Sequence, residues 1–203
     1  MRNRERLLRA AVELFGDQGY ADTSVEDLLQ ATGVARSNFY YHFDGREGLA
    51  RELVRRWSEE RAGALERAVG DAGGSPEGRV RRVFAVARDA DDEGDGTSVV
   101  ASVALQRAPH DPAVRDALRS LMRDVERALA DALEELADGR EDAAVRAPTA
   151  ARLGALVVVG AIDLDRAFPD AGETERAEEV FLRVAAPRTT DDPEPLAAVG
   201  SPV

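Results

Sequence analysis

The hydrophobic positions of this chain recur at intervals of three and four residues, which is typical of amphipathic helices. The longest stripe lies in residues 112–137, whose apolar face carries Val114, Leu118, Leu121, Met122, Val125, Leu129, Leu133 and Leu136. Similar spacing, interrupted by glycine, proline and acidic residues, predicts helices in residues 46–72, 76–90, 97–107, 148–169 and 174–185. The pattern after residue 46 therefore predicts a helical protein.

Residues 148–169 differ from the other predicted helices because they are apolar on nearly every side. Val157, Val158 and Val159 are β-branched and would also suit a strand, but the length of the segment and the prolines at its ends favour a helix. A helix without a polar face has to be buried all round, and a second copy of the chain could cover it. We therefore expect a dimer interface formed by this helix and the next, at Leu153, Leu156, Val157, Val158, Ile162, Val180, Phe181 and Val184.

Residues 23–46 have the organisation of a helix–turn–helix. The segment Thr23-Ser24-Val25-Glu26 can start a helix, because a hydroxyl caps free backbone N–H groups and Glu26 reaches back in a capping box. Gly33 then supplies the backbone angles of a tight turn. In the following helix Phe39 and Phe43 face inward, which leaves the outer and terminal surfaces to Arg36, Ser37, Asn38, Tyr40, Tyr41 and His42. Helices of this kind enter the major groove of DNA with their N-terminal residues toward the base edges.

The first 50 or so residues resemble the TetR/AcrR family of bacterial and archaeal transcription regulators. The matching positions are Phe15, Gly19-Tyr20, Thr23-Ser24, the FYYHF sequence at residues 39–43, Arg46 and Leu49. The resemblance implies an all-α fold of about nine helices. It places a three-helix helix–turn–helix DNA-binding domain in residues 1–46 and an antiparallel helical ligand-binding and dimerisation domain in residues 47–186. Residues 187–203 are rich in proline and acidic residues and are expected to be disordered.

The resemblance also implies which residues contact an operator in double-stranded DNA: Thr23, Ser24, Arg36, Ser37, Asn38, Tyr40, Tyr41, His42 and Arg46. Arginine can address guanine, and asparagine can address adenine, through paired hydrogen bonds. Three residues depart from the family pattern. Ala35 leaves the recognition helix without a side-chain N-cap, a loss of about 1 kcal/mol. Arg46 replaces a lysine and keeps its charge, whereas Asp44 places a negative charge near the expected phosphate contact.

The charge balance is unusual for a DNA-binding protein, because the formal net charge is −12. Residues 1–46 alone contain six arginines and seven acidic residues. Local placement matters more for phosphate contact, and the fold would bring to one side Arg2, Arg4, Arg6, Arg36 and Arg46. All 27 basic residues are arginine, which fits either a high-salt host or a GC-rich genome.

Several function classes find no support in the sequence. It contains no catalytic motif, so we expect neither an enzyme nor a cofactor. It contains no cysteine and no second histidine near His42, so we expect no metal site. Residues 89–94 resemble the start of a calcium loop, but Val100 stands where that motif needs a bidentate glutamate. The N-terminus is unlike a signal peptide and the apolar run 153–162 is too short for a bilayer, so we expect a cytoplasmic protein without a membrane partner.

Together these features predict a homodimeric transcriptional repressor that a small hydrophobic or amphipathic effector releases from a palindromic operator. The effector pocket is expected among the apolar inner faces of the second domain, at Trp57, Phe84, Val103, Leu121, Met122 and Val125. Ala35, Asp44 and the acidic balance leave an alternative open. In that alternative the chain is a helical homodimer that binds a small molecule or a protein without DNA-coupled regulation.

Overall fold

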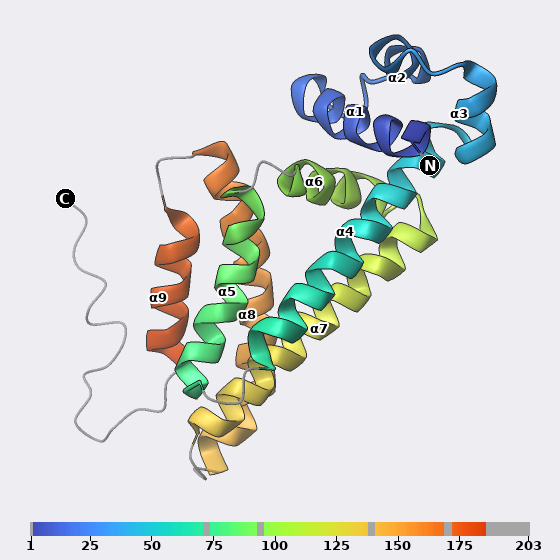
Figure 1. The fold of residues 1–203 in the computed structure, drawn as a ribbon. Coiled ribbons are helices and arrows are strands. Elements are labelled where there is room, and N and C mark those ends of the chain that lie inside the picture. Colours follow the sequence, from blue (N-terminus) through green and yellow to red (C-terminus); the bar gives the residue numbers. More distant parts are fainter. Residues whose placement is uncertain (1, 71–73, 93–95, 138–140, 169–171, 186–203) are drawn as a thin grey trace. The chain divides into compact units, whose positions relative to one another are not determined.

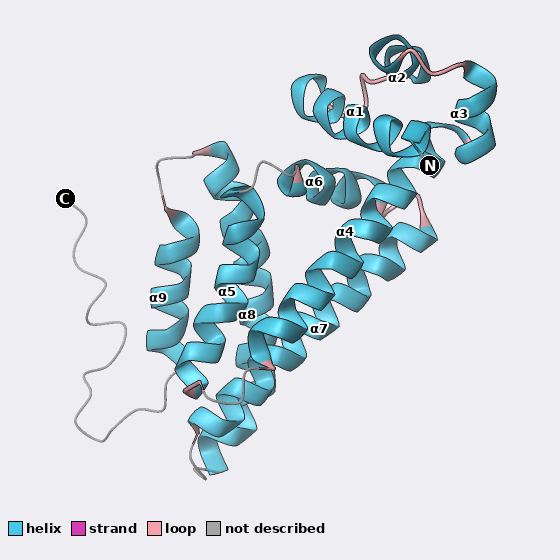
Figure 2. Cartoon of the chain, viewed as in Figure 1, coloured by secondary structure: helices cyan, strands magenta, loops and turns pink. Residues whose placement is uncertain are grey.

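The structure is a computed structural model that describes residues 2–70, 74–92, 96–137, 141–168 and 172–185. Figure 1 labels its helices, which are α1 (Arg2–Gln18), α2 (Val25–Thr32), α3 (Arg36–His42), α4 (Gly45–Val69), α5 (Pro76–Asp92), α6 (Thr97–Arg107), α7 (Pro112–Leu136), α8 (Glu141–Ala167) and α9 (Glu173–Ala185). The residues described contain helices and loops but no strand, as Figure 2 shows. The all-α fold is confirmed, and a helix replaces the strand that Val157, Val158 and Val159 could have formed.

The contacts divide the chain into two compact units. The first comprises residues 1–64 and 89–123, and the second comprises residues 65–88 and 124–203. The long helices α4 and α7 each contribute residues to both units. A boundary at Arg46 was expected. The first unit extends past it, because the start of α4 shares its apolar core and α6 packs on α1. The tail expected at residues 187–203 lies outside the described residues.

The core of the first unit forms around α1, which contacts α2, α3 and α6. Its most buried side chains are Leu7, Ala11, Leu28, Phe39, Leu49 and Val54. The start of α6 approaches α1 closely at Gly96, which has a φ of 74°. A Cβ atom at this position would lie 1.9 Å from Cγ1 of Val12, so both the backbone angle and the packing require glycine.

Asp111 joins α4 to α7 within the first unit and is 3% exposed. Its carboxylate caps α7 by accepting hydrogen bonds from the amides of Ala113 (3.0 Å) and Val114 (3.3 Å), and it forms an ion pair with Arg51 (2.9 Å). Burial alone would raise the pKa of this carboxyl, but the bonds from Arg51 and the two amides outweigh burial and lower the pKa. The sequence does carry a signal for this role, because Asp111 directly precedes a proline at the first position of a helix.

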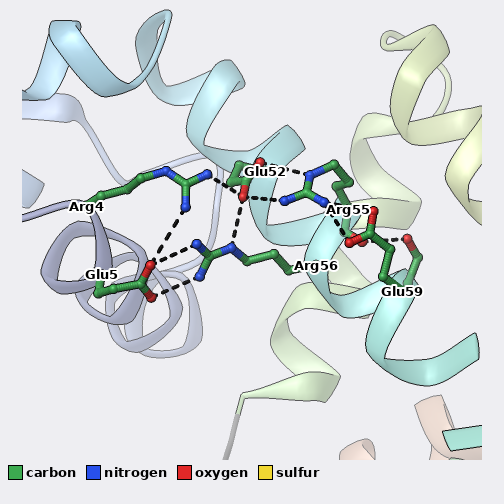
Figure 3. A network of polar contacts seen from close by, with 7 residues as sticks. Arg4, Glu5, Glu52, Arg55, Arg56 and Glu59 are labelled. Carbon is green, nitrogen blue, oxygen red and sulfur yellow. Dashed lines mark hydrogen bonds and ion pairs between the residues drawn. The ribbon is translucent and has the colours of Figure 1, made fainter. Parts of the chain in front are cut away.

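A network of arginines and glutamates fixes α1 to α4, and Figure 3 shows its members. Glu52 of α4 is shared by Arg4 of α1 and by Arg55 and Arg56 of its own helix. Arg56 also donates to both carboxylate oxygens of Glu5, at 2.8 and 2.9 Å. Hydrogen bonds from Arg55, followed by those from Arg4 and Arg56, outweigh burial and lower the pKa of Glu52 to about 2. Charged hydrogen bonds therefore connect the first helix of the chain to α4.

The second unit has its own apolar core, formed mainly by α5, α7, α8 and α9. Phe84 and Phe181 pack with ring centroids 5.6 Å apart. The Phe181 ring lies against Gly154, where a Cβ atom would be 2.7 Å from the ring carbons. A glycine at this point lets α9 pack closely on α8.

The start of α8 differs from the prediction. The helix begins at Glu141 and contains Pro148 in its interior, whereas a start at Pro148 was expected. Proline removes a single backbone hydrogen bond and bends a helix without always ending it. The preceding residues include Ala143, Ala144 and Ala147, which favour helix, so the helix continues through the proline. Of the helices described, none is long and apolar enough to span a membrane.

Replacing Glu52 with glutamine should lower the free energy of unfolding at neutral pH by about 1 kcal/mol, because three arginines lose a shared carboxylate at a partly exposed site. The folded pKa of about 2 lies below the ordinary value of 4.5. The wild type therefore keeps this stabilisation above pH 4.5 and loses it as the pH falls towards 2. Urea unfolding over this range measures both effects. Glu59→Gln, which removes an exposed partner of Arg55, is the control, and equal pH profiles for Glu52→Gln and wild type would contradict the assignment.

Candidate nucleic-acid interface

The helix–turn–helix begins with a capping box at the start of α2. The Ser24 hydroxyl accepts a hydrogen bond from the Asp27 amide (3.2 Å), and the Asp27 carboxylate accepts one from the Ser24 amide (2.7 Å). Donation by the Ser24 hydroxyl, followed by that amide, lowers the pKa of Asp27. The expected partner was Glu26. That expectation was wrong because the N-cap is Ser24 and the third residue after it is Asp27.

The turn between α2 and α3 contains Gly33, which has a φ of 62° and donates its amide to the Leu29 carbonyl at 2.8 Å. Ala35 is the N-cap of α3 and makes no side-chain capping bond, as expected. Phe39 and Phe43 point inward, and they are 0% and 4% exposed. These two rings fix the orientation of α3, so its opposite face is turned outward.

The outward face of α3 carries most of the residues expected to contact DNA. Arg36 and Ser37 are exposed at the start of the helix, and Tyr40 and Tyr41 are exposed beyond them. His42 is half-buried, with its ring 5.0 Å from that of Tyr41.

Asn38 is placed differently from its neighbours on α3. It is half-buried, and its amide oxygen is enclosed without a hydrogen-bond partner among the described residues. Arg36 and Ser37 therefore present more accessible polar groups than Asn38 does.

Thr23 and Arg46 belong to the interior of the helix–turn–helix rather than to its outer face. Thr23 is 1% exposed, and its hydroxyl donates to the Gly19 carbonyl at 2.8 Å. Nη1 of Arg46 donates to the carbonyls of Tyr20 (3.1 Å), Ala21 (2.9 Å) and Thr23 (2.7 Å). The guanidinium also lies 4.5 Å from the centroid of the Tyr20 ring. Both side chains hold the loop between α1 and α2, which speaks against the DNA contacts expected of them.

The arginines expected near phosphates are largely engaged within the protein. Arg4 pairs with Glu52, Arg6 donates to the Thr32 carbonyl, and Arg46 holds the loop carbonyls. Arg36 pairs with Glu26 of α2. Arg2 is exposed. The positive charge available to phosphates is therefore smaller than the number of arginines implies.

A model of a known family covers this part of the chain. The family, described as bacterial regulatory proteins of the tetR family, matches residues 7–53. The N-terminal domain belongs to the tetR family. Among relatives, the HTH-type transcriptional regulator TcmR of Streptomyces glaucescens is 37% identical over 114 residues, which are 53% of this chain and 50% of TcmR. YezE of Bacillus subtilis (strain 168), also an HTH-type regulator, is 32% identical over 109 residues, 52% of this chain and 55% of YezE.

The chain thus spans about half the length of these curated relatives. Solved structures show a likeness of fold over most of the chain. A transcriptional regulator from Rhodococcus sp. Rha1 superposes with a TM-score of 0.73 at 20% identity, covering 90% of this chain and 95% of that one. SmeT in its complex with triclosan gives a TM-score of 0.70 at 22% identity, covering 96% of this chain and 100% of SmeT. These likenesses show a shared fold.

The residues predicted to line an effector pocket are divided between the two cores. Trp57 and Val103 belong to the core of the first unit, and Phe84 and Val125 to that of the second. Leu121 and Met122 are half-buried in the first unit. Neither unit alone brings all six together.

The second unit also contains a hollow that the sequence did not suggest. It has a volume of about 450 Å³ and is lined by Glu77, Arg81, Leu136, Glu179, Leu182 and Arg183. Four of these six residues are charged, and none belongs to the predicted pocket.

The residues predicted for a dimer interface fall into two groups. Leu153, Leu156, Val180 and Val184 are exposed apolar side chains of α8 and α9. Val158 and Phe181 are each 5% exposed and form part of the core of the second unit, so they cannot also face a partner. Val157 is half-buried, and the side chain of Ile162 lies outside the described residues.

Two further residues of this region are exposed, Leu164 and Phe168. Their four-residue spacing after Leu156 and Gly160 was a signal that would have found them.

Replacing Arg46 with alanine should lower the melting temperature by several degrees, because three backbone carbonyls lose their donor, at a cost of about 1–3 kcal/mol. Arg36→Ala removes an arginine of the exposed face and is the matched control, for which the melting temperature should stay unchanged. Differential scanning calorimetry of both variants makes the comparison. If Arg46→Ala melted like the wild type and only weakened DNA binding, Arg46 would be a phosphate contact instead.

Proposed function

We propose that this chain is a homodimeric transcriptional repressor that binds a palindromic operator in double-stranded DNA and is released by a small molecule. The observation that carries the proposal is the outward face of α3 within a tetR-family helix–turn–helix. The relatives TcmR and YezE are named as transcriptional regulators and not as enzymes, which supports regulation over catalysis. A protein with this role acts in the cytoplasm, where the chromosome lies.

The chemistry of α3 suits the major groove. Arg36 and Ser37 stand at its first turn, where recognition helices approach base edges, and an arginine can bind O6 and N7 of guanine together. Tyr40 and Tyr41 extend from the same helix and can donate their hydroxyls to phosphates. Ser24 and His42 complete the proposed contacts, together with Asn38 if its side chain turns outward.

Selection of a randomised pool of DNA duplexes by the full chain should enrich a palindrome whose half-site centres lie about 10 base pairs, or a multiple of that, apart. Arg36→Ala should weaken binding to the enriched duplex by about 1–3 kcal/mol, roughly 5- to 150-fold, and relax the preference at one position in each half-site. Arg9→Ala removes an exposed arginine of α1 and should leave the preference intact. Gel-shift titration measures the affinities. Enrichment of no sequence would reject the operator-binding proposal.

Dimerisation is supported by the exposed apolar side chains of α8 and α9. Four apolar side chains are each more than half exposed: Leu153, Leu156, Val180 and Val184. Exposure of a contiguous apolar surface to water is unfavourable. A two-fold axis through such a surface would bury it against the same surface of a second copy. We infer that these four residues, with Leu164 and Phe168, form the interface.

Leu156→Glu and Val180→Glu should each shift the chain from dimer to monomer and abolish operator binding, because a buried unpaired carboxylate opposes association. Leu105→Glu places the same charge at an exposed leucine of α6 and should leave the dimer intact. Sedimentation velocity and gel shift of the three variants test this. A monomeric Leu156→Glu that still bound the palindrome with full affinity would reject the symmetric dimer.

A hydrophobic or amphipathic effector is supported by the surroundings of four predicted pocket residues. Trp57 and Val103 lie among apolar side chains of the first unit, and Phe84 and Val125 lie among apolar side chains of the second. Nε1 of Trp57 is enclosed without a partner among the described residues, so it could donate to a polar group of a bound molecule. The complex of SmeT, a protein of the same fold, contains triclosan. The charged hollow beside α9 would suit an ionic compound better than an apolar one, so we do not assign the hydrophobic effector to it.

An effector should raise the melting temperature and lower operator affinity, because it prefers the state that binds DNA poorly. A thermal-shift screen of apolar, amphipathic and small charged compounds, followed by gel shift of each hit, measures both quantities. Hits that stabilise the protein but leave operator affinity unchanged would favour the alternative of a ligand-binding dimer uncoupled from DNA.

A further inference from the structure

The exposed side of the helix–turn–helix contains one ion pair that links its two helices. Glu26 lies in the first turn of α2, and Arg36 is the first residue of α3. Their side chains pair although they are 58% and 61% exposed. An ion pair with this exposure contributes little to stability. The capping box of α2 uses Ser24 and Asp27, so the start of that helix does not depend on Glu26 either.

The pair changes what Arg36 can do on DNA. A lone exposed arginine attracts any phosphate, and this attraction makes nonspecific binding strong and dependent on salt. The carboxylate of Glu26 cancels that charge locally. A guanidinium has five N–H donors, so one edge can hold the carboxylate while another remains available for O6 and N7 of a guanine. Arg36 can therefore form directional bonds to a base but gains little from a phosphate.

We propose that Glu26 determines sequence specificity by positioning Arg36 for guanine and by withholding its charge from phosphates. Glu26 is a positioning residue that acts through Arg36. This inference rests on the proposed operator binding. It assigns to α2 a part in base discrimination. Glu26 does not need to contact DNA itself for this effect.

The orientation of Arg36 is the second part of the argument. Arginine carries about 2 kcal/mol of side-chain rotamer entropy, which binding has to overcome. A partner on the neighbouring helix restricts the side chain before DNA arrives. Restriction favours the one duplex whose guanine meets the guanidinium, and it does not favour a duplex of unrelated sequence.

Glu26→Gln tests the inference, since the variant keeps the shape of the side chain and removes its charge. The DNA probes are the duplex enriched by the wild type and a scrambled duplex of the same composition. Affinity for the scrambled duplex should rise about 3- to 10-fold, and the slope of its affinity against salt should steepen by up to about 0.9, as one more phosphate is neutralised. The preference for guanine at the position that depends on Arg36 should fall about 5-fold or more.

Three further variants make the result specific. Glu13→Gln removes an exposed carboxylate of α1 and should raise affinity for both duplexes equally and slightly. Glu26→Asp keeps the charge and should retain most of the guanine preference. In the Arg36→Ala background, Glu26→Gln should cause no further change in base preference, because its effect passes through Arg36.

The outcomes separate this inference from the proposed function. If Glu26→Gln changed both duplexes equally, as Glu13→Gln does, or if Glu26→Asp behaved like Glu26→Gln, the inference would be overturned and operator binding would stand. An effect of Glu26→Gln that persisted without Arg36 would mean that Glu26 meets DNA itself, which also overturns it. If the wild type enriched no sequence, both would fall. Melting temperatures of all variants exclude loss of folding as the cause.

Discussion

The side chain of Glu52 is only 15% exposed, so its carboxylate requires positively charged partners. One of these partners is Arg4 of α1, and this ion pair fixes α1 on α4. Arg4, Arg55 and Arg56 surround it, and Arg56 extends the contact to Glu5. Since α1 also packs on α2 and α3, the same charges that fix α1 determine where the recognition helix stands relative to α4 within the first unit. Because these guanidinium groups are neutralised by carboxylates of the protein itself, they offer little positive charge to DNA phosphates.

This constraint shapes the proposed contact with DNA. A basic protein can rely on many phosphate contacts, and its affinity then depends strongly on salt. Here Arg4, Arg6 and Arg46 bind acceptors of the protein itself, which fixes helices and loops instead. Recognition must depend more on hydroxyls and on a few directed side chains of α3. Such an interface would have a low affinity for DNA of unrelated sequence but would still discriminate between sequences.

The sequence was most informative where one face of a helix is polar. The stripe from Val114 to Leu136 predicted α7 to within one residue, and the four-residue spacing of Phe39 and Phe43 predicted which side of α3 is buried. It was least informative for α8, because a segment apolar all round does not show which side faces its own core. Val158 therefore proved to be a core residue, whereas its neighbour Leu156 is exposed.

The partners of the charged side chains could not be predicted from local sequence patterns either. Arg46 meets carbonyls about 25 residues earlier in the chain, and Arg56 meets a carboxylate 51 residues away, so no spacing rule could pair them. The neighbouring hydroxyls Thr23 and Ser24 show the same limit at short range. Either could begin a helix, and the difference of one residue decides whether Asp27 or Glu26 closes the capping box. That single step leaves Glu26 free to face Arg36.

Arg46 donates hydrogen bonds to the carbonyls of Tyr20, Ala21 and Thr23. These bonds connect the two ends of the segment that contains α2 and α3. In a chimera designed to recognise a different operator, this whole segment would have to be exchanged as one piece. A graft of residues 24–43 alone would leave behind both the Arg46 guanidinium and its three carbonyl acceptors, so the orientation of the grafted helices would depend on the residues of the recipient. A graft of residues 19–46 would carry the guanidinium donor and its carbonyl acceptors together. The natural unit of exchange is therefore longer than the two helices that approach DNA.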